Sequence, residues 1–279
     1  MGNHRVVIEP HTTDKNYWKD LWKFRELFYF LAWRDLLVRY KQTAIGVLWS
    51  IIRPLLTLSV MAFIGWLFES NIPEGTPRLL LVAAATLPWT FFSTAFSESA
   101  NSLIANSNLL TKVYFPRMIV PASTIIVCLV DFLISFAILI VLMVVYQYTP
   151  SINMLMLPLF LLLALITALG SGLYIAALNV KYRDFRYIVP FIVQFGLYIS
   201  PIAFSSQDIY QSERIPEIIK WIYSMNPMVA VIDGFRWSIL GTNDLYLPGF
   251  FISSAISLFL LFFGIYYFRK TEKSFADVI

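Results

Sequence analysis

Residues 118–146 read MIVPASTIIVCLVDFLISFAILIVLMVVY, an apolar run in which Asp131 is the only charged side chain. The hydrocarbon core of a bilayer is about 30 Å thick, and about 20 apolar residues in a helix cross it. Backbone amides in lipid must be hydrogen-bonded within their own segment, and the run lacks the alternation of a membrane β-strand. We therefore expect a membrane-spanning helix here.

Similar blocks on both sides of this run bring the predicted number of spans to six. They are residues 46–68, 79–102, 118–146, 155–178, 187–204 and 247–268. The composition agrees, because 58% of the 279 residues are apolar and only 14% are charged, whereas about a quarter are charged in a soluble domain. We expect an all-α integral membrane fold, with residues 25–279 as one transmembrane domain and residues 1–24 as a polar cytoplasmic tail.

The distribution of Lys and Arg predicts the orientation. With the N-terminus in the cytoplasm, sixteen of the 21 Lys and Arg residues lie on inner segments and four on outer loops. Cytoplasmic loops of membrane proteins carry this excess of positive charge. We expect a multi-pass protein with both termini in the cytoplasm.

Residues 25–42, before the first span, predict an amphipathic helix. Tyr29, Trp33, Leu36 and Tyr40 share one stripe at helical spacing, and charged side chains lie roughly opposite. Such a helix lies in the membrane interface with its aromatic face in lipid. A simple membrane anchor is the alternative.

Residues 205–246, before the last span, predict two short outer helices. Asn226-Pro227 separates them, and the segments 218–223 and 228–240 are apolar enough to touch lipid. We expect a pair of half-inserted helices, with a plain amphipathic loop as the alternative.

The sequence offers few groups for chemistry. Cys128 lies in a predicted span, and His4 and His11 lie in the polar tail. These numbers exclude an intrachain disulfide and a metal site built from His and Cys. Neither a Gly-Lys-Ser/Thr phosphate loop nor a nucleophile elbow occurs. We expect no catalytic site, cofactor or metal in this chain.

Three ionisable residues fall inside predicted spans, where inserting each at mid-membrane costs about 2.5–3.5 kcal/mol of free energy. Arg53 can extend its side chain to the cytoplasmic surface, and we expect Glu98 to pair with Arg53 or to meet the loop that follows. Asp131 is the most central, and a structural, hydrogen-bonded role is favoured over a proton relay, which needs several such groups.

The fourth predicted span carries Ala164, Ala168, Gly172 and Ala176 at a strict spacing of four residues. Small residues on one helix face allow another helix to approach closely. This stripe predicts helix packing and no chemistry.

Aromatic residues are dense, and some fall where a transport pathway could use them. Aromatic faces stack on sugar rings without fixing a moving chain in place. The candidates are Trp49, Trp66, Trp89, Phe92, Phe195 and Tyr198. The alternative for each is an ordinary lipid-facing position.

Residues 108–121, NLLTKVYFPRMIVP, resemble the first cytoplasmic loop of type-2 ABC exporter permeases for bacterial polysaccharides. Further similar segments are GVLWSIIRP at 46–54, NVKYRD at 179–184, YISPI at 198–202 and NPMVAVIDGFR at 226–236. The resemblance covers nearly the whole chain in the right order. The family includes exporters of O-antigen, capsule and teichoic acid.

The resemblance implies a homodimer in the bacterial inner membrane, above two ATP-binding cassette subunits that bind the ATP and Mg²⁺. Residues 24–42 become an interface helix, residues 106–116 a coupling helix on the ATPase, and the first and fifth spans the lining of the pathway. The expected coupling residues are Asn108, Lys112, Tyr114 and Phe115 in the loop, with Arg34 and Arg39 in the interface helix.

The implied substrate is a lipid-linked, O-antigen-like polysaccharide, as in lipopolysaccharide biosynthesis, with membrane lipids around the protein and no nucleic-acid partner. A permease for a smaller drug or lipid amphiphile is the alternative. A membrane enzyme is disfavoured by the missing catalytic groups, and a proton-coupled transporter by the shortage of buried carboxylates.

Overall fold

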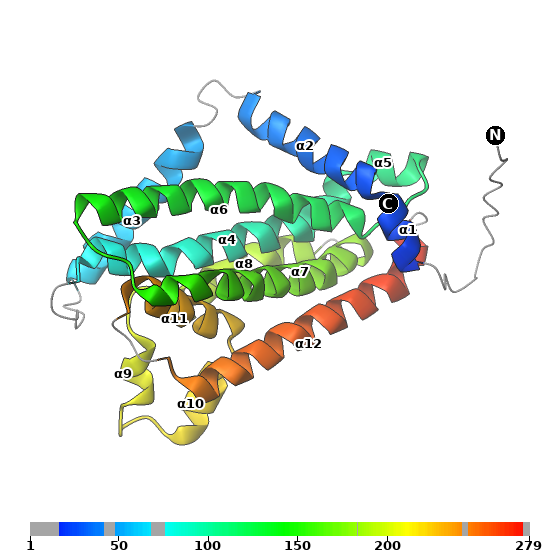
Figure 1. Ribbon diagram of the computed structural model, residues 1–279. Helices are drawn as coiled ribbons and strands as arrows, with labels where there is room; N and C mark the ends of the chain where they lie inside the picture. Colours follow the sequence, from blue (N-terminus) through cyan, green and yellow to red (C-terminus); the bar gives the residue numbers. More distant parts are fainter. Residues whose placement is uncertain (1–16, 42–47, 68–75, 183, 242–244, 276–279) are drawn as a thin grey trace.

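The computed structural model describes residues 17–41, 48–67, 76–182, 184–241 and 245–275, and within these ranges the regular secondary structure is helical, without a strand. The long helices form one bundle (Figure 1). The α-helices are α1 Tyr17–Lys23, α2 Arg25–Lys41, α3 Leu48–Leu67, α4 Arg78–Ala105, α5 Ser107–Lys112, α6 Ile119–Val145, α7 Leu157–Lys181, α8 Phe185–Ile199, α9 Ser206–Tyr210, α10 Glu217–Ser224, α11 Pro227–Leu240 and α12 Leu247–Thr271. The 3₁₀ helices are η1 Ile152–Met156 and η2 Glu272–Ser274.

The all-α membrane fold is confirmed at the level of its long helices. Within the described ranges, four helical segments are long and apolar enough to cross a membrane: Arg78–Ala105, Ile119–Val145, Ile152–Lys181 and Leu247–Ser274. The first and fifth predicted spans correspond to shorter apolar helices, Ile51–Ile64 and Phe185–Ile199. The helix of the fifth predicted span, α8, ends at Ile199 and not at the predicted residue 204. Pro201 disfavours a helical conformation at the residue before it, and so ends the helix.

Helix α4 is the centre of the bundle. It packs on α3, α6, α7, α8 and α11, and most of its apolar side chains are buried, including the run Val82–Leu87. A helix that is apolar on all sides is stable only where neighbours cover each side. The position of α4 therefore follows from its composition.

The small-residue stripe on α7 packs as the sequence predicts. Its residues Ala164, Ala168, Gly172 and Ala176 are buried, and α4 is the helix that approaches. A Cβ atom added to Gly172 would lie 2.5 Å from the Oγ atom of Ser99 on α4. Such a distance is far below van der Waals contact, so the Ser99 side chain occupies the space that any larger residue at position 172 would need.

A second close crossing joins α7 to α12, and the sequence stripe does not reveal it. A Cβ atom on Gly264 would lie 2.1 Å from the backbone oxygen of Gly170. Since both residues are glycine, the last long helix can lie directly against α7.

At one end of the bundle, α9, α10 and α11 fill the connection between α8 and α12 (Figure 1). The break predicted at Asn226-Pro227 is confirmed: the Asn226 side chain accepts a hydrogen bond from the Met228 amide at 3.0 Å and caps α11, and Pro227 takes the first helical position, where no amide is needed. The short α9 is an addition that the sequence does not predict.

Buried Arg236 fastens α11 to the end of α8. Its guanidinium donates to the backbone oxygens of Phe204 at 2.8 Å and Ile202 at 2.9 Å. Asn226 adds a bond to the Ser200 hydroxyl at 3.1 Å. Arg236, one of the four cations that the predicted topology places on outer loops, is therefore a buried structural residue.

Candidate functional site

Helix α5 and the strand-like segment after it form a loop between α4 and α6, at the same end of the bundle as α1 and the end of α12 (Figure 1). The backbone of Asn106 joins α4 to α5, and Leu110 anchors α5 from its buried side. The exposed side chains of the loop include Asn108, Thr111, Lys112, Val113 and Tyr114. The loop thus presents a mixed polar and aromatic face outward.

Phe115 does not belong to that face, which corrects the expectation that it packs into a partner beside Tyr114. Its ring is 4% exposed, whereas the side chain of Tyr114 is 61% exposed. Pro116 holds the preceding residue in an extended conformation, and neighbouring side chains in an extended chain point to opposite sides. If Tyr114 faces outward, Phe115 must therefore face the interior.

Arg34 and Arg39, which the sequence suggests as partner contacts, bind groups of their own chain. Arg34 donates to the side-chain oxygen of Asn106 at 2.8 Å and pairs with Asp35. The helix before the first span is therefore tied directly to the residue at which the α5 loop begins.

Arg39 lies between two carboxylates on different long helices. It forms ion pairs with Glu98 on α4 and Asp131 on α6, and the Tyr40 hydroxyl also bonds to Asp131. The structural role predicted for Asp131 is confirmed. Pairing with Arg53 is one of two alternatives expected for Glu98, and the structure instead pairs Glu98 with a cation from α2.

The candidate pathway aromatics divide into two groups. Trp89 and Phe92 are 6% and 8% exposed and pack with ring centroids 5.6 Å apart. A Cβ atom on Gly196 would lie 2.6 Å from the Trp89 ring, so this ring fills the contact between α4 and α8. In this conformation, neither residue can touch a substrate.

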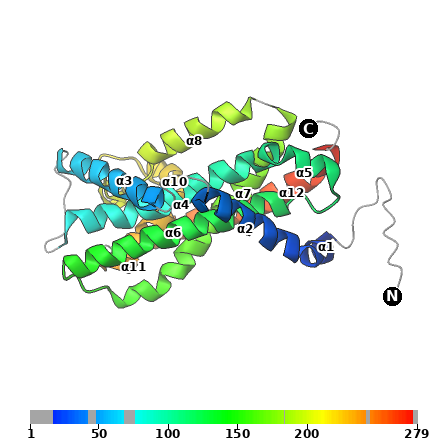
Figure 2. The same cartoon turned by 90° about the horizontal axis from the view of Figure 1, so that it is seen from above.

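The other group is exposed. Trp49 on α3 is 43% exposed, and Phe195 and Tyr198 on α8 are 63% and 70% exposed. The guanidinium of Arg53 lies 5.7 Å from the centre of the Trp49 ring. Both helices pack on α4 from outside the bundle (Figure 2). The side chain of Trp66 lies outside the described residues.

The family called ABC-2 type transporter matches residues 26–240. This chain belongs to that family. An ABC-2 chain is a membrane subunit of a transporter and not an enzyme. Among the residues that the structure describes, no three or more His, Cys, Asp or Glu side chains are grouped so that they could hold a metal ion.

The relatives of this ABC-2 chain include named exporters. It is 30% identical over 258 residues to an O-antigen export system permease protein RfbA of Klebsiella pneumoniae, covering 91% of this chain and 95% of the relative. The corresponding protein of Myxococcus xanthus is 27% identical over 94% of this chain and 98% of its own length. The polysialic acid transport protein KpsM of Escherichia coli is 25% identical over 86% and 92%.

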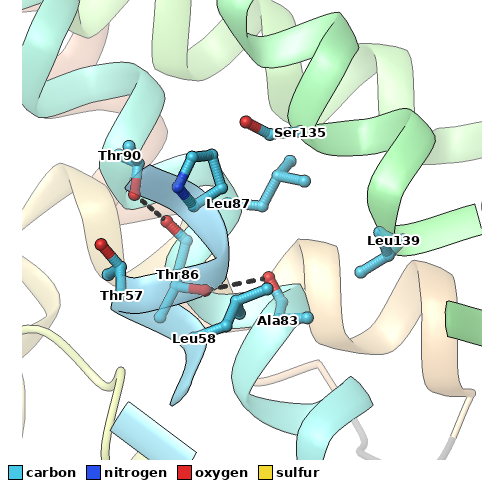
Figure 3. A pocket seen from close by; sticks show the side chains of 9 residues that line it. Thr57, Leu58, Ala83, Thr86, Leu87, Thr90, Ser135 and Leu139 are labelled. Atoms are coloured by element: carbon cyan, nitrogen blue, oxygen red, sulfur yellow. Dashed lines mark hydrogen bonds between the residues drawn. The ribbon is translucent and has the colours of Figure 1, made fainter. Parts of the chain in front are cut away.

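The ABC-2 chain also encloses a small cavity between α3, α4 and α6, of about 20 Å³. Figure 3 shows the hydroxyls of Thr57, Thr86, Thr90 and Ser135 around it. Thr86 and Thr90 donate to backbone oxygens of α4 at 2.9 and 2.8 Å. The volume suits about one water molecule, so the cavity is too small for a sugar residue.

Proposed function

We propose that this chain is the permease of an ATP-driven exporter that moves a lipid-linked, O-antigen-like polysaccharide across the bacterial inner membrane. The supporting observation is similarity over nearly the full length to permeases named for O-antigen export, at up to 30% identity. The ATP and Mg²⁺ are bound by two separate ATP-binding cassette subunits, since the sequence lacks a phosphate-binding loop.

The proposed topology has six spans with both termini in the cytoplasm. Helices α3 and α8 cross the membrane together with the four longer segments, and α2 is the interface helix. The excess of Lys and Arg on inner segments supports this orientation. The α5 loop is then cytoplasmic, and its exposed residues Asn108, Lys112 and Tyr114 seat on the ATPase.

The substrate path lies between two copies of this chain. Exposed aromatics on α3 and α8 support this proposal, because Trp49, Phe195 and Tyr198 are uncovered in the single chain. A second copy facing α3 and α8 would place these rings along a shared path. A polymer that must keep moving is best held weakly at many points, and ring faces provide such contacts.

The test measures surface polysaccharide in cells whose only permease is this chain, expressed with its ATPase. An aromatic contact contributes about 0.5–1.5 kcal/mol to binding. If each ring contributes an amount in this range, exchanging both Trp49 and Tyr198 for Ala should lower export of long chains about tenfold. Tyr198→Phe keeps the ring and loses only the hydroxyl, so it should export much more polysaccharide than Tyr198→Ala. Tyr266→Ala, at a tyrosine on α12 that is 65% exposed, is the matched control.

Protein level and assembly with the ATPase are measured in parallel. Normal export by Tyr198→Ala and Tyr198→Asp would remove α8 from the pathway. Export of a small amphiphile without any surface polysaccharide would refute the glycan substrate itself.

A further inference from the structure

Three segments that are far apart in the sequence meet at Glu272, the first residue of η2. The Tyr17 hydroxyl of α1 donates to the Glu272 carboxylate at 3.0 Å, across 255 positions of sequence. The Arg117 guanidinium, at the base of the α5 loop, donates to the backbone oxygen of the same residue. The beginning of the described chain, the loop and the end of the last long helix are thus joined at one residue.

Buried aromatic side chains surround the junction, and Glu272 itself is partly buried. Tyr17, Phe268 and Phe275 are 4%, 0% and 1% exposed, and the rings of Phe268 and Phe275 pack edge to face with centroids 5.4 Å apart. Arg269 lies over the Tyr17 ring at 4.2 Å, and Arg117 lies over Phe275 at 5.9 Å. These cation–ring contacts stabilise the two partly buried arginines.

The same apolar cluster contains the inner side of the loop. Leu110, Phe115 and Met118 belong to it together with Tyr17 and Phe275. Burial, and then the negative charge of Glu272, raises the pKa of the Tyr17 hydroxyl. The hydroxyl therefore keeps its proton at neutral pH and remains a donor to the carboxylate.

The loop is held at its other end as well. Arg34 of α2 donates to Asn106, where α5 begins, and the Arg117 bond holds the residue two positions before α6. Between these two attachments lie the exposed side chains Asn108, Lys112 and Tyr114. Both ends of the proposed ATPase-binding face are therefore tied to other parts of the chain.

We propose that α1 and η2 brace the base of the α5 loop, with Tyr17 and Glu272 as positioning residues, so that a push on α5 moves α6 and α12 instead of bending the loop. The proposal rests on the proposed docking of the ATPase at α5. A loop pinned at Arg117 passes its displacement to α6, which begins at Ile119, whereas an unpinned loop absorbs it by local rearrangement. Both α1 and η2 lie outside the matched residues 26–240.

The brace is tested in the full-length chain with Tyr17→Phe, which removes one hydroxyl and keeps the ring, and with Glu272→Gln. The matched control is Tyr29→Phe, at an exposed tyrosine of α2 that stacks on Trp33. The first readout is amide hydrogen exchange of residues 113–118 in the chain alone in lipid nanodiscs. Tyr17→Phe should speed this exchange by about threefold, the effect of losing one hydrogen bond, and Tyr29→Phe should leave it unchanged.

The second readout is polysaccharide exported per ATP hydrolysed by the complete transporter. Tyr17→Phe should lower this ratio about threefold with assembly intact, and the double variant Tyr17→Phe/Glu272→Gln should be no worse than the more severe single variant, because the two groups share one bond. Wild-type exchange in Tyr17→Phe would refute the brace. Faster exchange with an unchanged ratio would refute its part in transmitting motion.

Failure of the proposed function gives a different result. A wild-type complex that hydrolyses ATP without exporting polysaccharide would refute the polysaccharide-export function, while the exchange measurement would still decide whether α1 and η2 hold the loop.

Discussion

The crossing of α7 and α12 at Gly170 and Gly264 predicts a large effect from one methyl group. In Gly264→Ala, the new Cβ atom would lie 2.1 Å from the Gly170 oxygen and 2.9 Å from its carbonyl carbon. Van der Waals contact between such atoms lies at about 3.5 Å, so the helices must separate by roughly 1.4 Å. The carbonyl cannot swing away, because it belongs to a helix backbone.

Forcing extra atoms into a packed contact costs about 1–3 kcal/mol, and the better helix propensity of Ala offsets about 1 kcal/mol of that cost. Because the clash is with rigid helix backbone, we expect a cost near the upper end of this range and a net loss of about 2 kcal/mol. The assay is thermal unfolding of the purified full-length chain in detergent, where each kcal/mol corresponds to about 2–4 °C in a chain of this size. Ala255→Leu, at an exposed position of α12, is the control and should melt like the wild type.

The double variant sharpens the test. In Gly170→Ala, the new methyl would lie 2.5 Å from the backbone of Leu261, so this change alone should also destabilise the chain. Once the helices have separated, the second methyl has room, and Gly170→Ala/Gly264→Ala should cost less than the two single changes together. A Gly264→Ala chain that melts at or above the wild-type temperature would show that the two helices do not touch at this crossing.

Two further predictions concern α2 and the α5 loop. Arg39→Met leaves two carboxylates on α4 and α6 without their cation. Since these side chains are partly exposed, we expect the free energy of unfolding to fall by about 1–3 kcal/mol, whereas the control Arg53→Met should have little effect. Equal melting temperatures of the two variants would exclude a stabilising cluster. Phe115→Ala should destabilise the chain by about 3–5 kcal/mol. Tyr114→Ala should melt at the wild-type temperature but retain less ATPase on co-purification. The reverse pattern would show that Phe115 is the ring that faces the ATPase.

The membrane fold could be predicted because its determinants are local. A run such as residues 118–146 must be a helix in lipid, whatever else the chain does, since its amides have no other partner. The stripe from Ala164 to Ala176 is equally local, because helical spacing alone places small residues on one face. The break at Asn226-Pro227 needed only the capping preference of one residue and the missing amide of the next.

The inward position of Phe115 was within reach of the sequence as well. Pro116 makes the preceding residue extended, and an extended chain separates the two neighbouring rings. Residue type alone groups Tyr114 and Phe115 as one contact, whereas the direction of each side chain separates them.

Other features depend on which helix faces meet, and that information lies in the packing of the whole chain. The pairing of Arg39 with Glu98 and Asp131 needs α2 to lie against α4 and α6, and the bond from Tyr17 to Glu272 needs the two ends of the chain at the same end of the bundle. In a bilayer, the apolar face of one helix suits lipid as well as it suits another helix, so periodicity predicts where a helix is and leaves its neighbours open. Only close packing of particular side chains selects among those neighbours, and for this reason the contacts at Glu272 could be found in the tertiary structure alone.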